Sequence, residues 1–450
     1  MRSKFDLIII GSGSAATTVA FRAVKIGKKV AVIDQEPIGG TCALRGCDPK
    51  KVLVGVTDSL ESAKRLQGHG IAKLSAQIRW DELMEFKRSF TESMSSGIER
   101  SLRKNNIEII HGRAKFIGPE TLEVDGKIFE ANAFLIASGV KAAALNFPGS
   151  DLLIDNEGFL SMPNLPKKLV FVGGGYISVE FASIARKAGS EVTIIQHSDR
   201  ILANFDREVT EILDSLLRES GIEILVNTSV KGVRKVDERF EITLTREGKD
   251  EVIYADTVVH GAGREFDSDM GLEAGNIKWS RRGVEVDEYL RSVSNPRVYA
   301  AGDSADTGGP KLTPVAAMEG RIAGENLLNG NSLKADYNGI PTTVFSSPPL
   351  AMVGITEEQA FEKGLKINVR KGDMTSWYNS RRRMIPKSYY KIILDNNSKK
   401  ILGAHILGEN SEEVINIFSM AMRLGINVDT LLSMPFTYPS DTNDLKYMIS

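Results

Sequence analysis

The chain has two cysteines, Cys42 and Cys47, which lie five positions apart. A lone close pair is more often redox-active or metal-binding than structural in a reducing compartment, and two thiolates alone make a poor zinc site, which takes four ligands. In a straight α-helix, positions five apart are separated by about 7.5 Å of rise and roughly 140° of rotation, whereas a disulfide requires Cα atoms within about 7 Å. The spacing therefore predicts a distorted segment between the cysteines, which Gly46 and Pro49 permit.

Charged residues surround this pair. Arg45, Lys50 and Lys51 add positive charge, which favours a thiolate, while Asp48 opposes it. Arg45 and Lys50 either attract an anionic acceptor or form a solvated face. The residue types thus favour a redox-active pair over two buried structural thiols.

A dinucleotide-binding unit is predicted ahead of the cysteines. An apolar run over 5–10 is typical of a strand; a glycine turn, a helical pattern from 16 to 26 and a second strand over 29–33 follow it. In such a unit the first glycine permits a tight turn, the second lets the backbone approach a pyrophosphate at the helix N-terminus, and the acid after the second strand accepts from a ribose hydroxyl. The residues predicted to bind this dinucleotide are Gly11, Gly13, Ser14, Ala15, Ala16 and Asp34.

A second unit of the same plan begins at 168. A strand over 168–172 leads into three glycines, a helix and a strand over 192–195. That strand is followed by His197 and Arg200 in place of an acid, which favours NADPH because a carboxylate there would repel a 2′-phosphate; NADH is the alternative. The residues predicted to bind this dinucleotide are Gly173, Gly175, Tyr176, Ile177, Glu180, His197 and Arg200. Two such units suggest a hydride donor facing a flavin acceptor.

The segment 39–51 carries a more specific pattern. It reads GGTCALRGCDPKK and resembles the GGTCxxxGCxPxK motif of the pyridine nucleotide–disulfide oxidoreductases, the family of glutathione reductase, dihydrolipoamide dehydrogenase and mercuric reductase. Further stretches that resemble family motifs lie at 136–139, 261–264, 298–303, 312–316 and 340–345. The resemblance covers the whole chain and implies an α/β fold, with two Rossmann-like dinucleotide-binding domains and a C-terminal α+β dimerisation domain.

The resemblance also implies where the domains lie. We expect an FAD-binding domain formed by 1–150 and 266–338, an NAD(P)H-binding domain over 151–265 and an interface domain over 339–450. The interface domain is expected to hold strands at 344–345, 390–394 and 401–407 and a helix over 412–423. The family is typically a homodimer whose active site uses both subunits.

Roles for individual residues come from the same resemblance. Cys47 faces the flavin as a charge-transfer thiolate, and Cys42 is the outer thiol that meets the acceptor. Lys51 reaches flavin N5 and pairs with Glu180, while Tyr176 covers the nicotinamide side of the flavin. The cofactor contacts that the resemblance adds, including Asp303 at the FAD ribityl chain and Ala114 at the adenine, are Gly40, Thr41, Lys51, Ala114, Ser138, Gly139, Gly263, Arg264 and Asp303.

The C-terminal tail departs from the family pattern. Disulfide reductases of the family carry HPTxxE there, and its histidine moves a proton for the outer thiol. Here Tyr438 stands in the histidine position and Asn443 in the glutamate position, and no histidine follows His405. Histidine side chains titrate near about 6.5 and tyrosines near about 10, so a tyrosine is a poor base at neutral pH. Asp441 or Asp444 is an alternative base. Mercuric reductase shares the tyrosine but needs a cysteine pair close to its C-terminus, which this chain lacks.

The leading hypothesis is an FAD-dependent NAD(P)H oxidoreductase that passes electrons through the cysteine pair to a small-molecule acceptor. A small disulfide is the first candidate for this acceptor. A metal ion, a quinone or another non-thiol acceptor is the alternative, and it fits the absent histidine better. A flavin-binding protein without turnover is a third reading, which the retained cysteine and lysine positions disfavour.

The length and composition limit the classes of protein to which the chain can belong. The 450 residues suggest about three domains, and a net charge of −1 gives no electrostatic case for nucleic acid or an acidic membrane. Hydrophobic residues make up 42% and charged residues 26%, which is ordinary for a globular protein. The apolar run over 7–10 is too short for a signal peptide or a membrane span. We therefore expect a cytoplasmic protein with no bound metal, nucleic-acid partner or membrane attachment.

Overall fold

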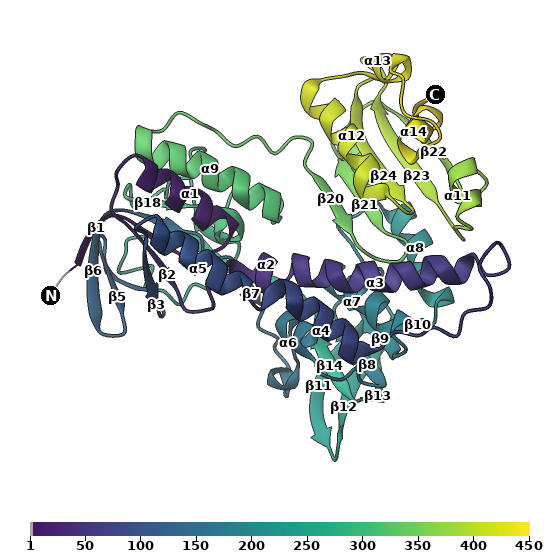
Figure 1. Cartoon of the computed structure of the whole chain (residues 1–450), viewed down its shortest axis with the longest axis horizontal. Helices are drawn as coiled ribbons and strands as arrows, with labels where there is room; N and C mark the ends of the chain where they lie inside the picture. The colour runs from purple at the N-terminus through teal and green to yellow at the C-terminus, as the bar shows by residue number, and fades with distance from the viewer. Residues whose placement is uncertain (1–2) are drawn as a thin grey trace. The chain divides into compact units, whose positions relative to one another are not determined.

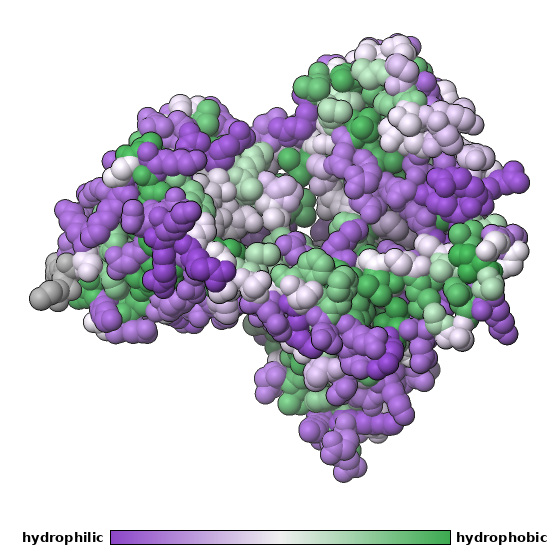
Figure 2. Space-filling view, in the orientation of Figure 1, coloured by the Kyte–Doolittle hydropathy of each residue, from purple (hydrophilic) through white to green (hydrophobic). Residues whose placement is uncertain are grey.

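The structure is a computed structural model and describes residues 3–450 (Figure 1). The chain divides into two compact units, and each is discontinuous in sequence. The first unit comprises the residues up to Lys50, Glu85–Ala143 and Arg264–Tyr337; the second comprises Lys51–Met84, Ala144–Gly263 and Asn338–Ser450. Most of the face shown in Figure 2 is hydrophilic, with smaller hydrophobic areas between the polar ones.

The first unit is built on a seven-stranded sheet in the order β3-β2-β1-β6-β5-β4, with β18 paired to β6. Its strands are β1 (Ser3–Ile10), β2 (Val30–Asp34), β3 (Glu108–His111), β4 (Lys115–Gly118), β5 (Thr121–Val124), β6 (Lys127–Ile136) and β18 (Val298–Ala300). Strand β1 lies between β2 and β6 and is parallel to both. Its side chains alternate between two cores, with Leu7 and Ile9 in one and Ile8 and Ile10 in the other, which explains its unbroken apolar run.

Helices and short elements complete this unit. Helices α1 (Ser14–Lys25) and α9 (Thr313–Asn329) share the core that holds Leu7 and Ile9. The other elements of the unit are α2 (Gly40–Arg45), α5 (Met94–Lys104), β7 (Lys141–Ala142), β15 (Arg264–Glu265), β16 (Trp279–Ser280), β17 (Gly283–Glu285), η2 (Gly302–Ser304) and β19 (Ala305–Asp306). Helices α3 (Cys47–Arg65) and α4 (Trp80–Thr91) run across the boundaries of the units in sequence.

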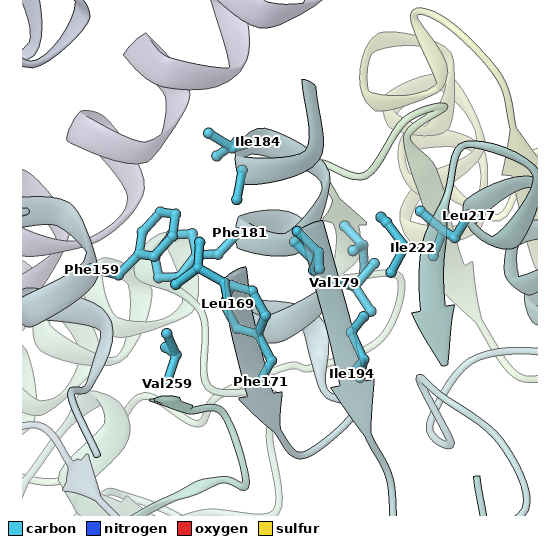
Figure 3. Close-up of a cluster of buried hydrophobic side chains, with 14 of the residues drawn as sticks. Phe159, Leu169, Phe171, Val179, Phe181, Ile184, Ile194, Leu217, Ile222 and Val259 are labelled. Atoms are coloured by element: carbon cyan, nitrogen blue, oxygen red, sulfur yellow. The ribbon is translucent and has the colours of Figure 1, made fainter. Parts of the chain in front are cut away.

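The second unit contains a parallel sheet in the order β10-β9-β8-β14. Its strands are β8 (Lys168–Val172), β9 (Glu191–Ile195), β10 (Ile222–Leu225) and β14 (Thr257–His260). One face packs on α7 (Tyr176–Lys187), α8 (Arg207–Glu219) and α6 (Asn156–Ser161), in the cluster drawn in Figure 3. There Phe159 stacks on Phe181 with ring centroids 4.2 Å apart. The other face packs on an antiparallel sheet of β11 (Thr228–Val236), β12 (Arg239–Arg246) and β13 (Lys249–Ala255), and η1 (Ser150–Leu152) precedes α6.

The same unit also holds a five-stranded antiparallel sheet in the order β20-β21-β24-β23-β22. Its strands are β20 (Pro341–Val344), β21 (Leu350–Gly354), β22 (Ile367–Asp373), β23 (Tyr389–Asp395) and β24 (Ile401–Leu407). Helices α12 (Ser411–Leu424), α13 (Val428–Ser433) and α14 (Asp441–Ile449) share a core with this sheet. Two shorter helices, α10 (Glu357–Glu362) and α11 (Tyr378–Arg382), lie in its connections.

These elements confirm the predicted fold class, which has two Rossmann-like dinucleotide-binding domains and a C-terminal α+β domain. The strand expected over 29–33 is β2, and the helix expected over 412–423 is α12. The apolar run over 7–10 lies inside β1. Across residues 3–450, every helix is too short or too polar to span a bilayer.

Candidate active site

The segment between the two cysteines is broken at one residue. Helix α2 ends at Arg45, Gly46 adopts φ −145° and ψ −111°, and α3 begins at Cys47. A Cβ on Gly46 would lie 3.0 Å from the Thr41 carbonyl oxygen and 3.4 Å from the Cα of Cys42. The chain therefore folds back closely on Cys42 at this glycine, as the spacing predicted.

The two sulfur atoms have different surroundings. Both cysteines are free thiols; Cys42 is half-buried and Cys47 is exposed. A hydrogen bond with Cys47, followed by burial, raises the pKa of Cys42, and the hydroxyl of Thr313 partly offsets this effect. Thr313 Oγ1 also lies 3.7 Å from Cys47 Sγ. The Cys42 thiol therefore holds its proton to higher pH than an ordinary thiol.

Thr313 was not among the predicted site residues. It opens α9, and its hydroxyl contacts both sulfur atoms. The sequence signal was available, because Thr313 belongs to the stretch 312–316 that resembles a family motif. That motif identified the segment without showing which of its side chains faces the cysteines.

The glycine turn between β1 and α1, called here the first cradle, fits a pyrophosphate. Gly11 has φ +100°, and a Cβ there would lie 2.2 Å from the carbonyl oxygen of Ala137. A Cβ on Gly40, which has φ +76°, would lie 2.5 Å from the Cα of Gly13. Gly13 caps α1 with no side-chain bond, so the first N–H groups of the helix are open to an anion. Ser14, Ala15 and Ala16 form this first turn.

Two carboxylates of the first unit suit the remainder of FAD. Asp34 ends β2 and accepts from Ser12 Oγ at 2.6 Å, which fixes its orientation. Asp303 follows β18, and burial raises its pKa although Arg264 and Lys311 act in the opposite direction. The nearest Arg264 nitrogen is 3.9 Å away, so the Asp303 carboxylate has acceptor capacity for a ligand hydroxyl. Other predicted contacts in this unit are Thr41 in α2, Ala114 between β3 and β4, and Ser138 and Gly139 after β6. Gly263, which precedes Arg264, belongs to the second unit.

The second cradle has the same geometry. Gly173 has φ +101°, and a Cβ there would lie 2.5 Å from the Cα of Ala262. Gly175 caps α7 without a side-chain bond, and the helix begins with Tyr176, which is 48% exposed, and Ile177. Gln196 stands where an acid is usual, and its Oε1 accepts from the N–H of Gly174 at 2.8 Å. The residues present therefore fit a second dinucleotide.

The two basic side chains near this cradle differ in what they contact. Arg200 donates to the carbonyl oxygens of Phe205 at 2.9 Å and Ala203 at 2.8 Å, which anchors its guanidinium to the local loop. His197 is exposed directly after β9. His197 is therefore the predicted residue more open to a ligand.

Lys51 and Glu180 both lie against Phe345. The Nζ of Lys51 is 3.8 Å from the centroid of the Phe345 ring, and the N–H of Phe345 donates to Glu180 Oε1 at 2.9 Å. The carboxylate that contacts Lys51 Nζ is Glu412, at 3.3 Å. Glu412 had no recognisable signal in the sequence, since it is far from Lys51 along the chain.

The tail is held by side chains of α11, of the residue after it and of the residue before α12. Asp441 accepts from Arg383 and, at 2.7 Å, from Asn410, and Asp444 accepts from Asn379 at 2.9 Å. Burial raises the pKa of Asp444.

Two further side chains bear on proton transfer at the tail. Tyr438, in the histidine position, is 72% exposed. His405 is buried in β24 and its Nε2 lies 3.1 Å from the carbonyl oxygen of Ile355. The last histidine of the sequence therefore lies in the sheet, and the tail has no imidazole side chain.

Comparison with known proteins agrees with this geometry. The family model described as pyridine nucleotide-disulphide oxidoreductase matches residues 5–320, and the dimerisation domain of that family matches 340–449. Mercuric reductase from Bacillus cereus is 31% identical over 450 residues, covering 99% of this chain and 71% of that protein. Dihydrolipoyl dehydrogenase from Geobacillus stearothermophilus is 30% identical over 442 residues, covering 97% and 93%.

A solved structure is similar over the same length. It is described as the Cu(II) complex of the HOCl-induced flavoprotein disulfide reductase RclA from Escherichia coli, with a TM-score of 0.89, 28% identity and 99% of each chain covered. The matched dimerisation domain supports a homodimer. The predicted use of FAD and NAD(P)H is confirmed, and both glycine cradles fit these cofactors. The chain is an FAD-dependent NAD(P)H disulfide oxidoreductase and belongs to the pyridine nucleotide-disulphide oxidoreductase family.

Proposed function

We propose that the Cys42/Cys47 pair reduces a thiophilic metal cation, with Cu(II) as the first candidate. The observation that carries this proposal is the tail, where exposed Tyr438 replaces the histidine that a disulfide reductase needs to protonate a leaving thiol. A metal cation leaves without taking up a proton, so its reduction does not depend on that histidine. A mercuric reductase and the Cu(II) complex of RclA among the similar proteins support the same class of acceptor.

The roles of the residues follow the chemistry of the pair. Bound NAD(P)H and FAD supply two electrons to the cysteines. In this proposal Cys42 is the outer sulfur that meets the cation, and Cys47 faces the flavin. Oxidation of the two thiols to one disulfide releases two electrons and two protons, so two Cu(II) ions leave as Cu(I). In this proposal Lys51 and Glu180 adjoin the flavin and Tyr176 covers its nicotinamide side.

Three finer assignments belong to the same proposal. NADPH is preferred over NADH, because neutral Gln196 and exposed His197 follow β9. The chain forms three domains, with FAD bound by 1–150 and 266–338, NADPH by 151–265 and the dimer contact by 339–450. The active site is shared between the two subunits of the homodimer.

A small disulfide is the second candidate acceptor, and one observation favours it. Asp444 is the alternative acid or base at the tail, and burial raises its pKa. The dihydrolipoyl dehydrogenase relatives support this reading.

An anaerobic panel of acceptors with NADPH as donor separates the two candidates. We expect turnover with Cu(II), loss of that turnover in Cys42→Ser, and slow turnover with small disulfides that Tyr438→His accelerates. Fast reduction of one small disulfide by the unaltered enzyme, abolished in Cys42→Ser, would establish the second candidate instead. Cu(II) reduction that persists in Cys42→Ser would show that the thiols are not the electron donors.

A further inference from the structure

The ammonium group of Lys51 is held by side chains from two other elements. Glu412 Oε1 is 3.3 Å from Lys51 Nζ, and the face of the Phe345 ring is 3.8 Å from it on another side. A carboxylate and an aromatic face together restrict the ammonium more than either group alone. The Lys51 side chain is 49% exposed, so these contacts, more than burial, set its position.

Glu412 is well suited to this contact. It lies in the first turn of α12, where the positive end of the helix dipole favours a carboxylate. Its Oε2 is buried and has no hydrogen-bond partner among residues 3–450. The carboxylate therefore has a second acceptor that a small movement of the ammonium would satisfy.

A second ion pair fixes α12 against α3. Arg65, at the C-terminal end of α3, pairs with Glu409 just before α12, and Arg383 lies 3.7 Å from the other oxygen of Glu409. Lys51 and Arg65 thus extend from the same helix to two glutamates three positions apart. The start of α12 is held in place independently of Lys51.

Glu180 is less available to Lys51 than Glu412. Its Oε1 already accepts from the N–H of Phe345, and its side chain is buried in α7. Phe345 therefore lies between the buried carboxylate and the ammonium, in contact with each.

We propose that Glu412 is a positioning residue for Lys51, holding its ammonium on the Phe345 ring. Lys51 follows Cys47 by four residues in α3, so the two side chains share one face of that helix. This inference rests on the proposed role of Lys51 beside the flavin, and it adds a carboxylate from the dimerisation domain to that role.

The test is chemical labelling of Lys51 in the FAD-loaded protein without turnover. Limiting acetic anhydride, with peptide mass spectrometry, gives the acetylation rate of Lys51 relative to Lys64, an exposed lysine of the same helix. Glu412→Gln removes the charge and leaves the shape, so we expect a roughly two- to fivefold faster reaction at Lys51, the range of a half-exposed ion pair. Glu412→Asp withdraws the carboxylate by one methylene and is expected to give a smaller rise.

The control is Glu413→Gln, which removes the same charge from the adjacent, exposed position. It should leave the labelling of Lys51 unchanged. An equal rise in the acetylation rate of Lys51 in Glu413→Gln would show that the effect comes from net charge alone. An unchanged rate in both Glu412 variants would overturn the proposal. A rise in the acetylation rate of Lys51 in Glu180→Gln alone would show that Glu180, and not Glu412, pairs with Lys51. These outcomes do not depend on which acceptor the enzyme reduces, so failure here and failure of the metal-reductase proposal are distinguishable.

Discussion

Substitution of Gly11 by alanine tests whether the first cradle is a packed cofactor site. Gly11 has φ +100°, and its added Cβ would lie 2.2 Å from the carbonyl oxygen of Ala137. That carbonyl cannot retreat freely, because the N–H of Ala137 donates to the oxygen of Ile10 at 2.8 Å. Gly27, at the other end of α1, has φ +79° and nothing within 4 Å of its Cβ position. The pair Gly11→Ala and Gly27→Ala therefore shares the backbone strain and differs in the clash.

The expected magnitudes follow from these two effects. A positive φ costs an alanine about 1–2 kcal/mol, and this is the whole effect at Gly27. At Gly11 the Cβ must also displace backbone from 2.2 Å to beyond the 3.0 Å that real contacts respect, and such overpacking costs about 1–3 kcal/mol more. Moving this turn also moves the N-terminus of α1, where the pyrophosphate is expected to bind, so we expect FAD affinity to fall about tenfold or more.

Urea unfolding of the two apoproteins measures the stability difference, and titration with FAD measures the affinity. Gly27→Ala should lose the smaller amount of stability and retain the FAD affinity of the unaltered protein. If both variants lost equal stability and bound FAD equally well, the close approach of Gly11 to Ala137 would contribute nothing to the free energy of unfolding or to FAD binding, which would refute the prediction.

Three further predictions concern other parts of the chain. Gln196→Glu keeps the acceptor for the Gly174 N–H and adds a charge, so the ratio of kcat/KM for NADPH to that for NADH should fall about tenfold or more; an unchanged ratio would exclude this position as the determinant. Burial lowers the pKa of His405, so the unfolded state binds its proton more tightly and stability is lost as the pH falls below about 6.5; His405→Gln should remove that part of the acid dependence in urea unfolding at several pH values. Burial would raise the pKa of Glu208, but hydrogen bonds from Lys371 and Tyr389 outweigh it and lower that pKa from 4.5 to about 2. The stability that this carboxylate contributes above pH 4.5 is therefore lost as the pH falls toward 2. Glu208→Gln should make the free energy of unfolding depend less on pH in this range.

The local geometry of the site was accessible from sequence. Glycines at 11 and 173 were expected to permit tight turns, and both have positive φ with backbone in contact range. Gly46 was expected to allow a distortion between the cysteines, and the helix breaks there. Such features depend on the few residues around each glycine, so a short sequence window contains the information that determines them.

The contacts of the charged side chains were not accessible. Lys51 meets Glu412 across 361 positions of sequence, a pairing set by how α12 packs on the rest of its unit. Arg200 was expected to favour NADPH, and the sequence did not show that its guanidinium donates to carbonyl oxygens of the following loop. A long cationic side chain has many rotamers of similar energy, and the fold selects among them through distant partners that no local pattern reveals.

The single-glycine break between α2 and α3 has a consequence for how the enzyme releases its products. Cys42 in α2 and Cys47 at the start of α3 are held on either side of a one-residue break, so each thiol meets the other at a high effective concentration. Any group that binds covalently to Cys42 is then displaced by its neighbour faster than by a thiol from solution. Displacement leaves the Cys42–Cys47 disulfide, which two electrons from NAD(P)H through FAD would return to thiols, so the enzyme resists becoming trapped as a mixed adduct with its own acceptor.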